Sequence, residues 1–150
     1  MCATVVMGVM YLSAVLNDIS AYEIGTVYGK KPLAPKLSPK KTVEGSVAGV
    51  IGSTALSLFL PLAVRLLCKV VPAWKGLEAD IPSLWIFVVF GVVAGVVAQF
   101  GDLCASMIKR HYGVKDYGTI FPGHGGVMDR LDSILFNGLC AVILFGFVLK

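Results

Sequence analysis

The chain has 150 residues, of which 57% are apolar and 15% are charged, and its mean hydropathy is +0.83. Ordinary soluble domains carry about a quarter charged residues, so this composition excludes that class and predicts an integral membrane protein. The net charge of +4 is modest and unevenly placed, so its distribution matters more than its size. Nucleic acid is not expected as a partner.

Four apolar runs are close to the length of about 20 helical residues that crosses a bilayer. They cover residues 2–16, 46–64, 83–101 and 133–149. The first and last are marginal in length unless they extend into their polar flanks. The first run shows no signal-peptide features, because no basic segment precedes it and no small-residue cleavage site follows it. The expected fold is all-α: a polytopic membrane bundle of about four transmembrane helices, with residues 1–150 as one domain.

Small residues inside these runs indicate how the helices pack. Gly45 with Gly49, and Gly91 with Gly95, have the four-residue spacing that lets two helices approach closely. The four cysteines follow no metal-binding or redox spacing, and we interpret them as small lipid-facing or helix-facing residues. They are Cys2, Cys68, Cys104 and Cys140.

Basic residues are concentrated in two of the three loops between the runs. Residues 17–45 and 102–132 hold nine of the thirteen Lys and Arg residues. Because alternate loops lie on the same side of a membrane, the positive-inside rule places both loops in the cytoplasm and both termini outside. The sequence therefore predicts a polar site on the cytoplasmic side of the bundle. Four acids fall at that level: Asp18, Asp102, Asp129 and Asp132.

Helical spacing predicts that some of these acids act together. Asp129 and Asp132 present carboxylates on one helix face, while Asp102 and Ser106 share a face of the preceding helix. That helix is expected to continue to about His111 and so to project past the hydrocarbon. Carboxylate and hydroxyl oxygens are typical ligands of Mg²⁺, which also binds substrate phosphates. A solvated helix end is the alternative interpretation of any single acid.

A glycine-rich segment, FPGHGG, lies between these two helices at residues 121–126. Gly123, Gly125 and Gly126 permit a close approach of backbone N–H groups to phosphate, which a following helix N-terminus would favour. A plain turn is the alternative interpretation. For His124 three roles stay open: a general acid or base, a phosphate contact, or a strut within the loop.

Cationic side chains accompany the acids in greater number than a topology signal requires. For the lysines near residue 40, orientation of the protein is an equal alternative. Arg and Lys are the residues that recognise phosphate, so their interleaving with metal-binding acids indicates phosphoryl or nucleotidyl transfer. The cations are Lys40, Lys41, Lys109, Arg110, Lys115 and Arg130.

Residues 106–133, SMIKRHYGVKDYGTIFPGHGGVMDRLDS, resemble the signature of the phosphatidate cytidylyltransferases, or CDP-diacylglycerol synthases. That signature runs Ser, two residues, Lys-Arg, a spacer, Lys-Asp, then Pro-Gly-His-Gly-Gly and Asp-Arg-x-Asp. Residues 17–49 are also similar to this family, and Asp18 matches the acidic start of that block. Family members usually have several more N-terminal spans. The chain is therefore expected to correspond to the catalytic C-terminal half, or to a reduced form.

The resemblance implies a Mg²⁺-dependent membrane enzyme of phospholipid biosynthesis that condenses CTP with phosphatidic acid to give CDP-diacylglycerol and pyrophosphate. Its expected place is the bacterial inner membrane with the site facing the cytoplasm, and a second copy is a candidate partner because the family is commonly dimeric. By motif position, Asp102, Asp129 and Asp132 would hold the metal, with Lys109 and His124 as further catalytic residues. The implied substrate-binding residues are Lys40, Lys41, Ser106, Arg110, Lys115, Asp116, Gly123, Gly125, Gly126 and Arg130.

Three alternatives stay open at this point. A CTP-dependent lipid kinase would transfer the γ-phosphate in place of the nucleotidyl group. A transporter would use the acids to line an ion or proton path, since carboxylates within membranes often do so. An inactive scaffold would keep the fold without binding CTP.

Overall fold

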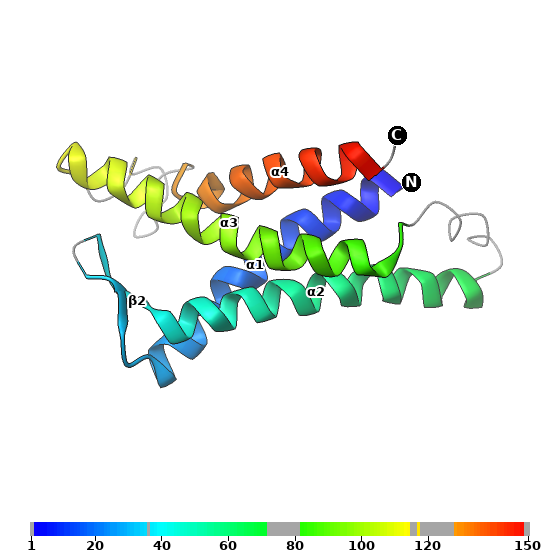
Figure 1. Ribbon diagram of the computed structural model, residues 1–150, viewed down its shortest axis with the longest axis horizontal. Coiled ribbons are helices and arrows are strands. Elements are labelled where there is room, and N and C mark those ends of the chain that lie inside the picture. Colours follow the sequence, from blue (N-terminus) through cyan, green and yellow to red (C-terminus); the bar gives the residue numbers. More distant parts are fainter. Residues whose placement is uncertain (1, 36, 72–81, 115–116, 118–127, 149–150) are drawn as a thin grey trace.

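Four long helices and one β-hairpin form the part of the chain that the structure describes (Figure 1). The computed structural model describes residues 2–35, 37–71, 82–114, 117 and 128–148, without the side chains of residues 2, 3, 128–132, 147 and 148. The elements are α1 (Cys2–Tyr28), β1 (Pro32–Ala34), β2 (Ser38–Thr42), α2 (Val43–Val70), α3 (Leu84–His111) and α4 (Met128–Val148).

The helices pack side by side, each mainly against its neighbours in the chain. α2 packs along α1 and α3, α3 packs against α4, and α1 also contacts α4. Figure 1 shows both termini at one end of the bundle and the hairpin at the other. The hairpin strands are antiparallel, with Pro32 opposite Thr42 and Ala34 opposite Ser38. We call the end that carries the hairpin the polar end.

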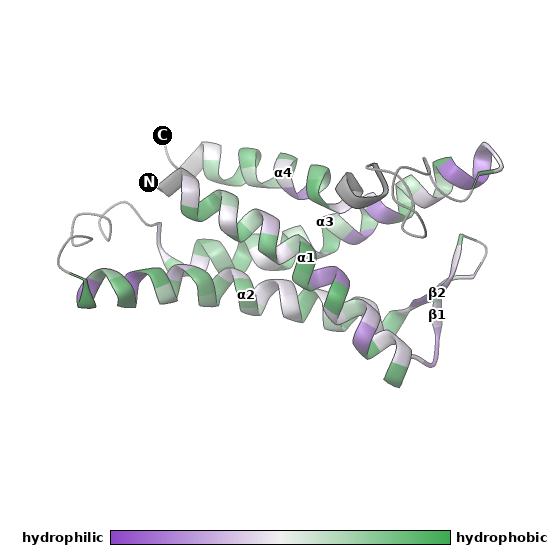
Figure 2. Ribbon diagram, turned by 180° about the vertical axis from the view of Figure 1, so that it is seen from behind, coloured by the Kyte–Doolittle hydropathy of each residue, from purple (hydrophilic) through white to green (hydrophobic). Residues whose placement is uncertain are grey.

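The outer surface of the bundle is suited to lipid. Thr4–Tyr28, α2 and α3 are each long and apolar enough to cross a membrane, while the apolar stretch of α4, Ser133–Gly146, is shorter. Large apolar side chains cover the outside; Phe59 and Val142, for example, are 65% and 72% exposed. Figure 2 shows hydrophobic residues along the helix shafts and hydrophilic ones at the polar end. The predicted all-α membrane bundle is confirmed.

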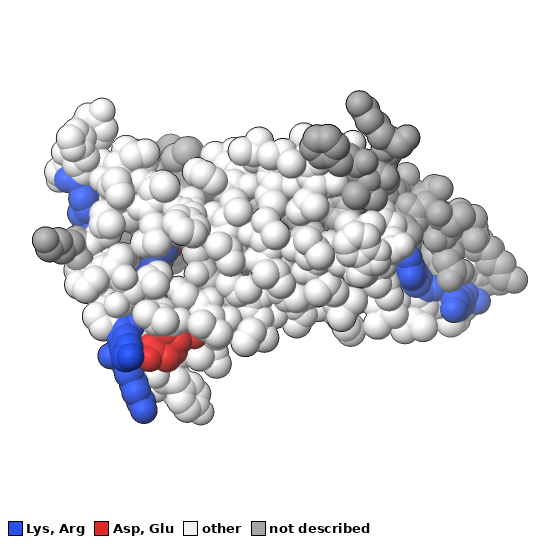
Figure 3. All heavy atoms as spheres, in the orientation of Figure 1, with Lys and Arg blue, Asp and Glu red and all other residues white. Residues whose placement is uncertain are grey.

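Among the residues described, charge is absent from the middle of the face that Figure 3 displays. Lys and Arg side chains lie towards its two ends, and the described residues in the broad band between them are uncharged. At the end opposite the hairpin, Arg65 and Lys69 lie in the last two turns of α2, and the guanidinium of Arg65 donates to the carbonyl of Pro82 at 2.8 Å. A wide uncharged band between charged ends matches a bilayer with water on both sides.

At the polar end, α1 and α3 extend furthest beyond their apolar runs. α1 continues to Tyr28, so the expectation of a loop beginning at residue 17 was wrong, and Asp18 lies within a helix. Polar residues there cost little because they lie near the membrane surface, where charges reach water. α3 continues to His111 as predicted, and the basic residues of its last turn favour the negative end of the helix dipole. Gly113 then ends it, with a φ of 70°.

The end of the bundle that holds the termini is packed with aromatic side chains. Phe87 and Phe90 of α3 lie against Phe145 of α4, with ring centroids 5.3 and 5.4 Å apart. Val6 and Val9 of α1 join the same buried cluster. We call this cluster the aromatic core.

Glycines bring the helices together where the sequence predicted close packing. A Cβ on Gly95 of α3 would lie 3.0 Å from the Cα of Val50 on α2, and one on Gly45 of α2 would lie 3.0 Å from the Cα of Gly25 on α1. Such short separations require residues without side chains. The close approach also allows the hydroxyl of Ser53 to donate to the carbonyl of Gly91 at 2.9 Å.

Candidate functional site

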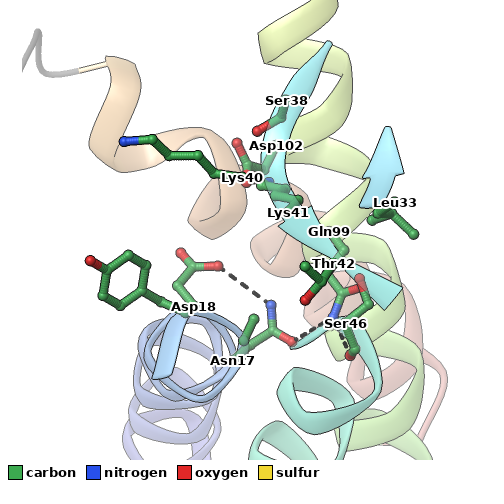
Figure 4. A pocket seen from close by; sticks show the side chains of 12 residues that line it. Asn17, Asp18, Leu33, Ser38, Lys40, Lys41, Thr42, Ser46, Gln99 and Asp102 are labelled. Carbon is green, nitrogen blue, oxygen red and sulfur yellow. Dashed lines mark hydrogen bonds and ion pairs between the residues drawn. The ribbon is translucent and has the colours of Figure 1, made fainter. Parts of the chain in front are cut away.

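A cavity of about 350 Å³ lies at the polar end, between the hairpin and the helices beneath it (Figure 4). Its wall combines charged, amide and hydroxyl side chains with a few apolar ones. The lining residues come from α1, both strands, α2 and α3. They are Asn17, Asp18, Ala21, Tyr22, Leu33, Ser38, Lys40, Lys41, Thr42, Ser46, Gln99 and Asp102.

An ion pair joins the hairpin to α3 at this cavity. Lys41 of β2 and Asp102 of α3 are directed towards one another in Figure 4 and form a salt bridge. Their side chains are 31% and 26% exposed, so both keep some access to water. The pair brings a cation and a carboxylate that are 61 positions apart in the sequence into one wall of the cavity.

The root of the hairpin is fixed to the start of α2. The carboxylate of Glu44 accepts hydrogen bonds from the backbone N–H groups of Lys30 and Lys31, at 3.1 and 3.2 Å. Thr42 caps α2 by accepting from the backbone N–H of Gly45 at 3.2 Å. Lys41 directly precedes this cap, so its position follows from the geometry of the helix end.

A hydrogen-bonded amide pair lies at the floor of the cavity. The side-chain nitrogen of Gln99 on α3 donates to the side-chain oxygen of Asn17 on α1 at 3.2 Å and to the backbone carbonyl of Ser46 on α2 at 2.8 Å. Figure 4 shows these two contacts meeting at the Gln99 amide. Three helices are therefore joined at one side chain.

Asp18 extends these contacts to the fourth helix. The side-chain nitrogen of Asn17 donates to one carboxylate oxygen of Asp18 at 3.4 Å, and the hydroxyl of Ser133 on α4 donates to the other at 3.3 Å. Ser133 directly follows Asp132 in the sequence. The start of α4, which carries the motif Asp-Arg-x-Asp, is therefore held against α1. We call Ser46, Gln99, Asn17, Asp18 and Ser133 the four-helix network.

The predicted site residues that the structure describes lie along one side of the polar end. Lys40, Lys41 and Asp102 line the cavity. Ser106, Lys109 and Arg110 occupy the next two turns of α3, beyond Asp102. The ammonium of Lys109 lies 5.3 Å from the ring centre of Tyr117, and the hydroxyl of that tyrosine donates to the carbonyl of Ala105 at 3.2 Å.

Other predicted residues fall outside the described part of the chain, and their roles stay predictions. Asp129, Arg130 and Asp132 lie in the first turns of α4, but their side chains are not among those described. Within the described side chains, no group of three or more His, Cys, Asp or Glu residues gathers as a metal site. The remaining predicted residues in this class are Lys115, Asp116, Gly123, His124, Gly125 and Gly126.

The donor atoms around the cavity fit a hard divalent cation. Asp18 and Asp102 both contribute carboxylates to its wall, and Asn17, Ser38 and Thr42 contribute amide and hydroxyl groups. Oxygen ligands of this kind are the ones that Mg²⁺ prefers. The residues present are therefore compatible with the predicted cofactor.

Several lining residues were not among the predicted site residues. Asn17, Ser46 and Gln99 belong to this group, and Asp18 had been placed only at the same membrane level. The sequence does contain one indication for Gln99: it precedes Asp102 by three residues, so the two residues share a helix face. The partners of Gln99 on α1 and α2 depend on how the helices pack, which spacing within one helix does not reveal.

Comparison with known proteins identifies the family of this chain. The model of the cytidylyltransferase family matches residues 3–148. The phosphatidate cytidylyltransferase of Staphylococcus saprophyticus is 40% identical over 126 residues, which cover 84% of this chain and 43% of the relative. That of Bacillus subtilis is 39% identical over 120 residues, covering 80% and 39%. The chloroplastic phosphatidate cytidylyltransferase 4 of Arabidopsis thaliana is 38% identical over 133 residues, covering 89% and 30%.

The chain thus spans less than half the length of each of these relatives. The match nevertheless covers nearly all of the chain itself, from the start of α1 to the end of α4. The chain belongs to the cytidylyltransferase family.

Proposed function

We propose that this chain carries the catalytic site of a phosphatidate cytidylyltransferase, which joins CTP to phosphatidic acid and releases pyrophosphate. The observation that carries the proposal is the ion pair between Lys41 and Asp102 in the wall of a cavity at the polar end. The pair supports the proposal because a lysine is suited to binding phosphate and a carboxylate is suited to holding a metal ion. The names of the relatives supply the two substrates.

The chemistry needs positioning more than it needs a strong base. A phosphate oxygen of phosphatidic acid is already an anion, and it attacks the α-phosphorus of CTP directly. The new bond joins that oxygen to the α-phosphorus, and the bond that breaks joins the α-phosphorus to the oxygen bridging to the β-phosphate, so pyrophosphate leaves. No covalent intermediate with the enzyme forms, and His124 is not required as a base.

Different side chains at the polar end bind the phosphates, orient the substrates and would hold the metal ion. Lys40, Lys41, Lys109 and Arg110 bind the phosphate groups and offset their negative charge as the substrates approach. The cavity orients the lipid phosphate against the nucleotide, because positioned reactants avoid much of the entropic cost of meeting in solution. Asp102, Asp129 and Asp132 would hold Mg²⁺, which when bound supplies further charge neutralisation on the phosphates.

The orientation in the membrane follows from the basic residues. Residues 17–45 and 102–132 hold nine of the thirteen Lys and Arg residues, which supports a cytoplasmic location for the cavity. CTP would then enter from the cytoplasm and phosphatidic acid from the surrounding bilayer. By this proposal the protein acts in the bacterial inner membrane.

The test follows two radioactive labels. The chain is reconstituted in phosphatidic acid vesicles with CTP labelled at either the α-phosphate or the γ-phosphate, with and without Mg²⁺. The proposal expects the α-label in the lipid fraction, the γ-label in pyrophosphate, and both transfers only with Mg²⁺. Asp102→Asn is expected to lower the rate by at least about 100-fold without unfolding the chain.

The other results each exclude the proposal. Transfer of the γ-label to lipid would identify a lipid kinase. Ion flux across the vesicles without nucleotide, and no label transfer, would identify a transporter. A folded preparation that neither binds CTP nor transfers either label would identify a scaffold.

A further inference from the structure

The four-helix network connects the helices from which the predicted metal acids come. Gln99 precedes Asp102 by three residues on α3, so the two share a helix face. At its other end the network reaches Ser133, the residue after Asp132 on α4. We propose that the four-helix network sets the position of the first turns of α4 relative to Asp102, and that Gln99 is its central positioning residue.

Gln99 determines the direction in which the Asn17 amide points. The amide nitrogen of Gln99 can only donate, so Asn17 must present its side-chain oxygen to it. The side-chain nitrogen of Asn17 is then the group that faces Asp18. Without the Gln99 donor, the Asn17 oxygen loses this partner, and the long contact with Asp18, at 3.4 Å, is left to orient the amide. One donor on α3 thus supports a contact between α1 and the acid that bonds to α4.

The helix spacing is built around this amide pair. A Cβ on Gly49 of α2 would lie 2.7 Å from the side-chain oxygen of Asn17 and 2.9 Å from the side-chain nitrogen of Gln99. Position 49 therefore has room for the amides only because it carries no side chain. Asn17 is fully buried, and hydrogen bonds away from water are stronger and more directional. These features favour a fixed geometry over a chance contact.

The first experiment compares two variants that each lose one side-chain donor of hydrogen bonds between helices: Gln99 donates two such bonds and Ser53 one. Gln99→Met keeps the length of the side chain but cannot donate. Ser53→Ala is the matched control, because Ser53 bonds α2 to α3 at Gly91, away from the cavity. We expect similar thermal stability for both. Only Gln99→Met should lower kcat about 10-fold and raise the Mg²⁺ concentration for half-maximal activity about 10-fold, with the KM for CTP little changed.

The second experiment measures geometry and does not require activity. Spin labels are placed on Cys104 of α3, which is exposed, and on Leu135→Cys of α4, which is 52% exposed, after the other cysteines are replaced by Ala. Gln99→Met should broaden the distribution of distances between the labels, and Ser53→Ala should not. The exchange Asn17→Gln with Gln99→Asn restores a donor and an acceptor, and it should recover part of the lost activity and narrow the distribution again.

The two readouts separate this inference from the proposed function on which its kinetic part rests. Broadened distances in a chain that transfers no label would overturn the proposed function and leave the positioning role standing. Equal behaviour of Gln99→Met and Ser53→Ala in both experiments would overturn the positioning role. So would an effect of Gln99→Met confined to the KM for CTP with unchanged distances, because Gln99 would then be a substrate contact.

Discussion

The two ends of the bundle are held together by different forces. At the end that holds the termini, Phe87, Phe90 and Phe145 fill the space between α3 and α4. At the polar end, Phe136 of α4 packs against Gly101 of α3, and the two helices are also joined, through α1, by the hydrogen bonds of the four-helix network. Dispersion contacts in the aromatic core depend on the distance between atoms and on how completely the space is filled, but hardly on direction. Hydrogen bonds depend on the donor–acceptor distance and on the angle at the hydrogen.

The difference separates stability from precise placement. Within a membrane, close packing supplies most of the attraction between helices, so the aromatic core is expected to carry stability. Directional bonds at the polar end fix how each helix is rotated about its axis, so this end is expected to carry activity. Substitutions in the aromatic core should therefore lower stability more than activity, and substitutions at the polar end should lower activity more than stability. Four predictions test that separation.

The largest effect on stability is expected from Phe90→Ala. Phe90 is fully buried, and its removal leaves a cavity between α3 and α4. The free energy of unfolding should fall by about 3–5 kcal/mol, measured by denaturant titration in detergent. The KM for CTP of the folded fraction should not change. A variant that stays stable but binds CTP poorly would erase the distinction between the two ends.

The largest effect on activity is expected from Lys41→Met. Loss of this cation removes the partner of Asp102 and one phosphate contact, so kcat/KM should fall about 100-fold, or about 2.7 kcal/mol. Stability should change by less than about 1 kcal/mol, because the pair keeps access to water. Lys30→Met, at the root of the hairpin, is the matched control. Equal losses of kcat/KM in both variants would mean that the lysines matter only for the orientation of the protein in the membrane.

A gain in stability is expected from Asn137→Leu. Asn137 lies one turn beyond Ser133 on α4, is fully buried, and has no hydrogen-bond partner for either amide atom among the described residues. A leucine of similar size should raise the free energy of unfolding by about 1–2 kcal/mol, since the buried amide no longer has to be desolvated. Thermal unfolding in detergent measures it. A loss of stability would reveal a polar partner for Asn137 and extend the polar end further into the membrane.

The smallest effect is expected from Thr42→Ala. The variant loses the cap of α2 and should lower the free energy of unfolding by about 1 kcal/mol. Because Lys41 is the adjacent residue, activity should fall as well, though less than in Lys41→Met. Thr42→Ser, which keeps the hydroxyl, should restore both. Activity that is unaffected by Thr42→Ala would show that the hairpin places Lys41 without help from the cap.

Much of the fold could be predicted because the length of an apolar segment can be read directly from the sequence. The apolar runs led to the helices, and Gly91 and Gly95 led to a close helix contact that the structure confirms. The hairpin was missed because its strands are short and contain Pro32 and Pro39, and so show no alternation. The extension of α1 to Tyr28 was missed because its last turns are not apolar enough to stand out.

The site was predictable in part for a similar reason. Lys40, Lys41 and Asp102 could be assigned to one polar layer because loop parity places them on the same side of the membrane. The pairing of Lys41 with Asp102, and of Gln99 with Asn17, could not be read from spacing, because each joins elements whose relative rotation is set by packing. Spacing within one segment therefore does not predict which side chains of different helices form hydrogen bonds or ion pairs.

The turn after α3 brings the chain back towards the level of Asp102. Gly113 reverses its direction, and the hydroxyl of Tyr117 bonds to the carbonyl of Ala105, only three residues beyond Asp102. At 1.5 Å per residue, that carbonyl lies about 4.5 Å further along the helix axis than the acid. Tyr117 thus lies back against the helix that it follows, close to the turn that carries Asp102, instead of extending into the aqueous phase.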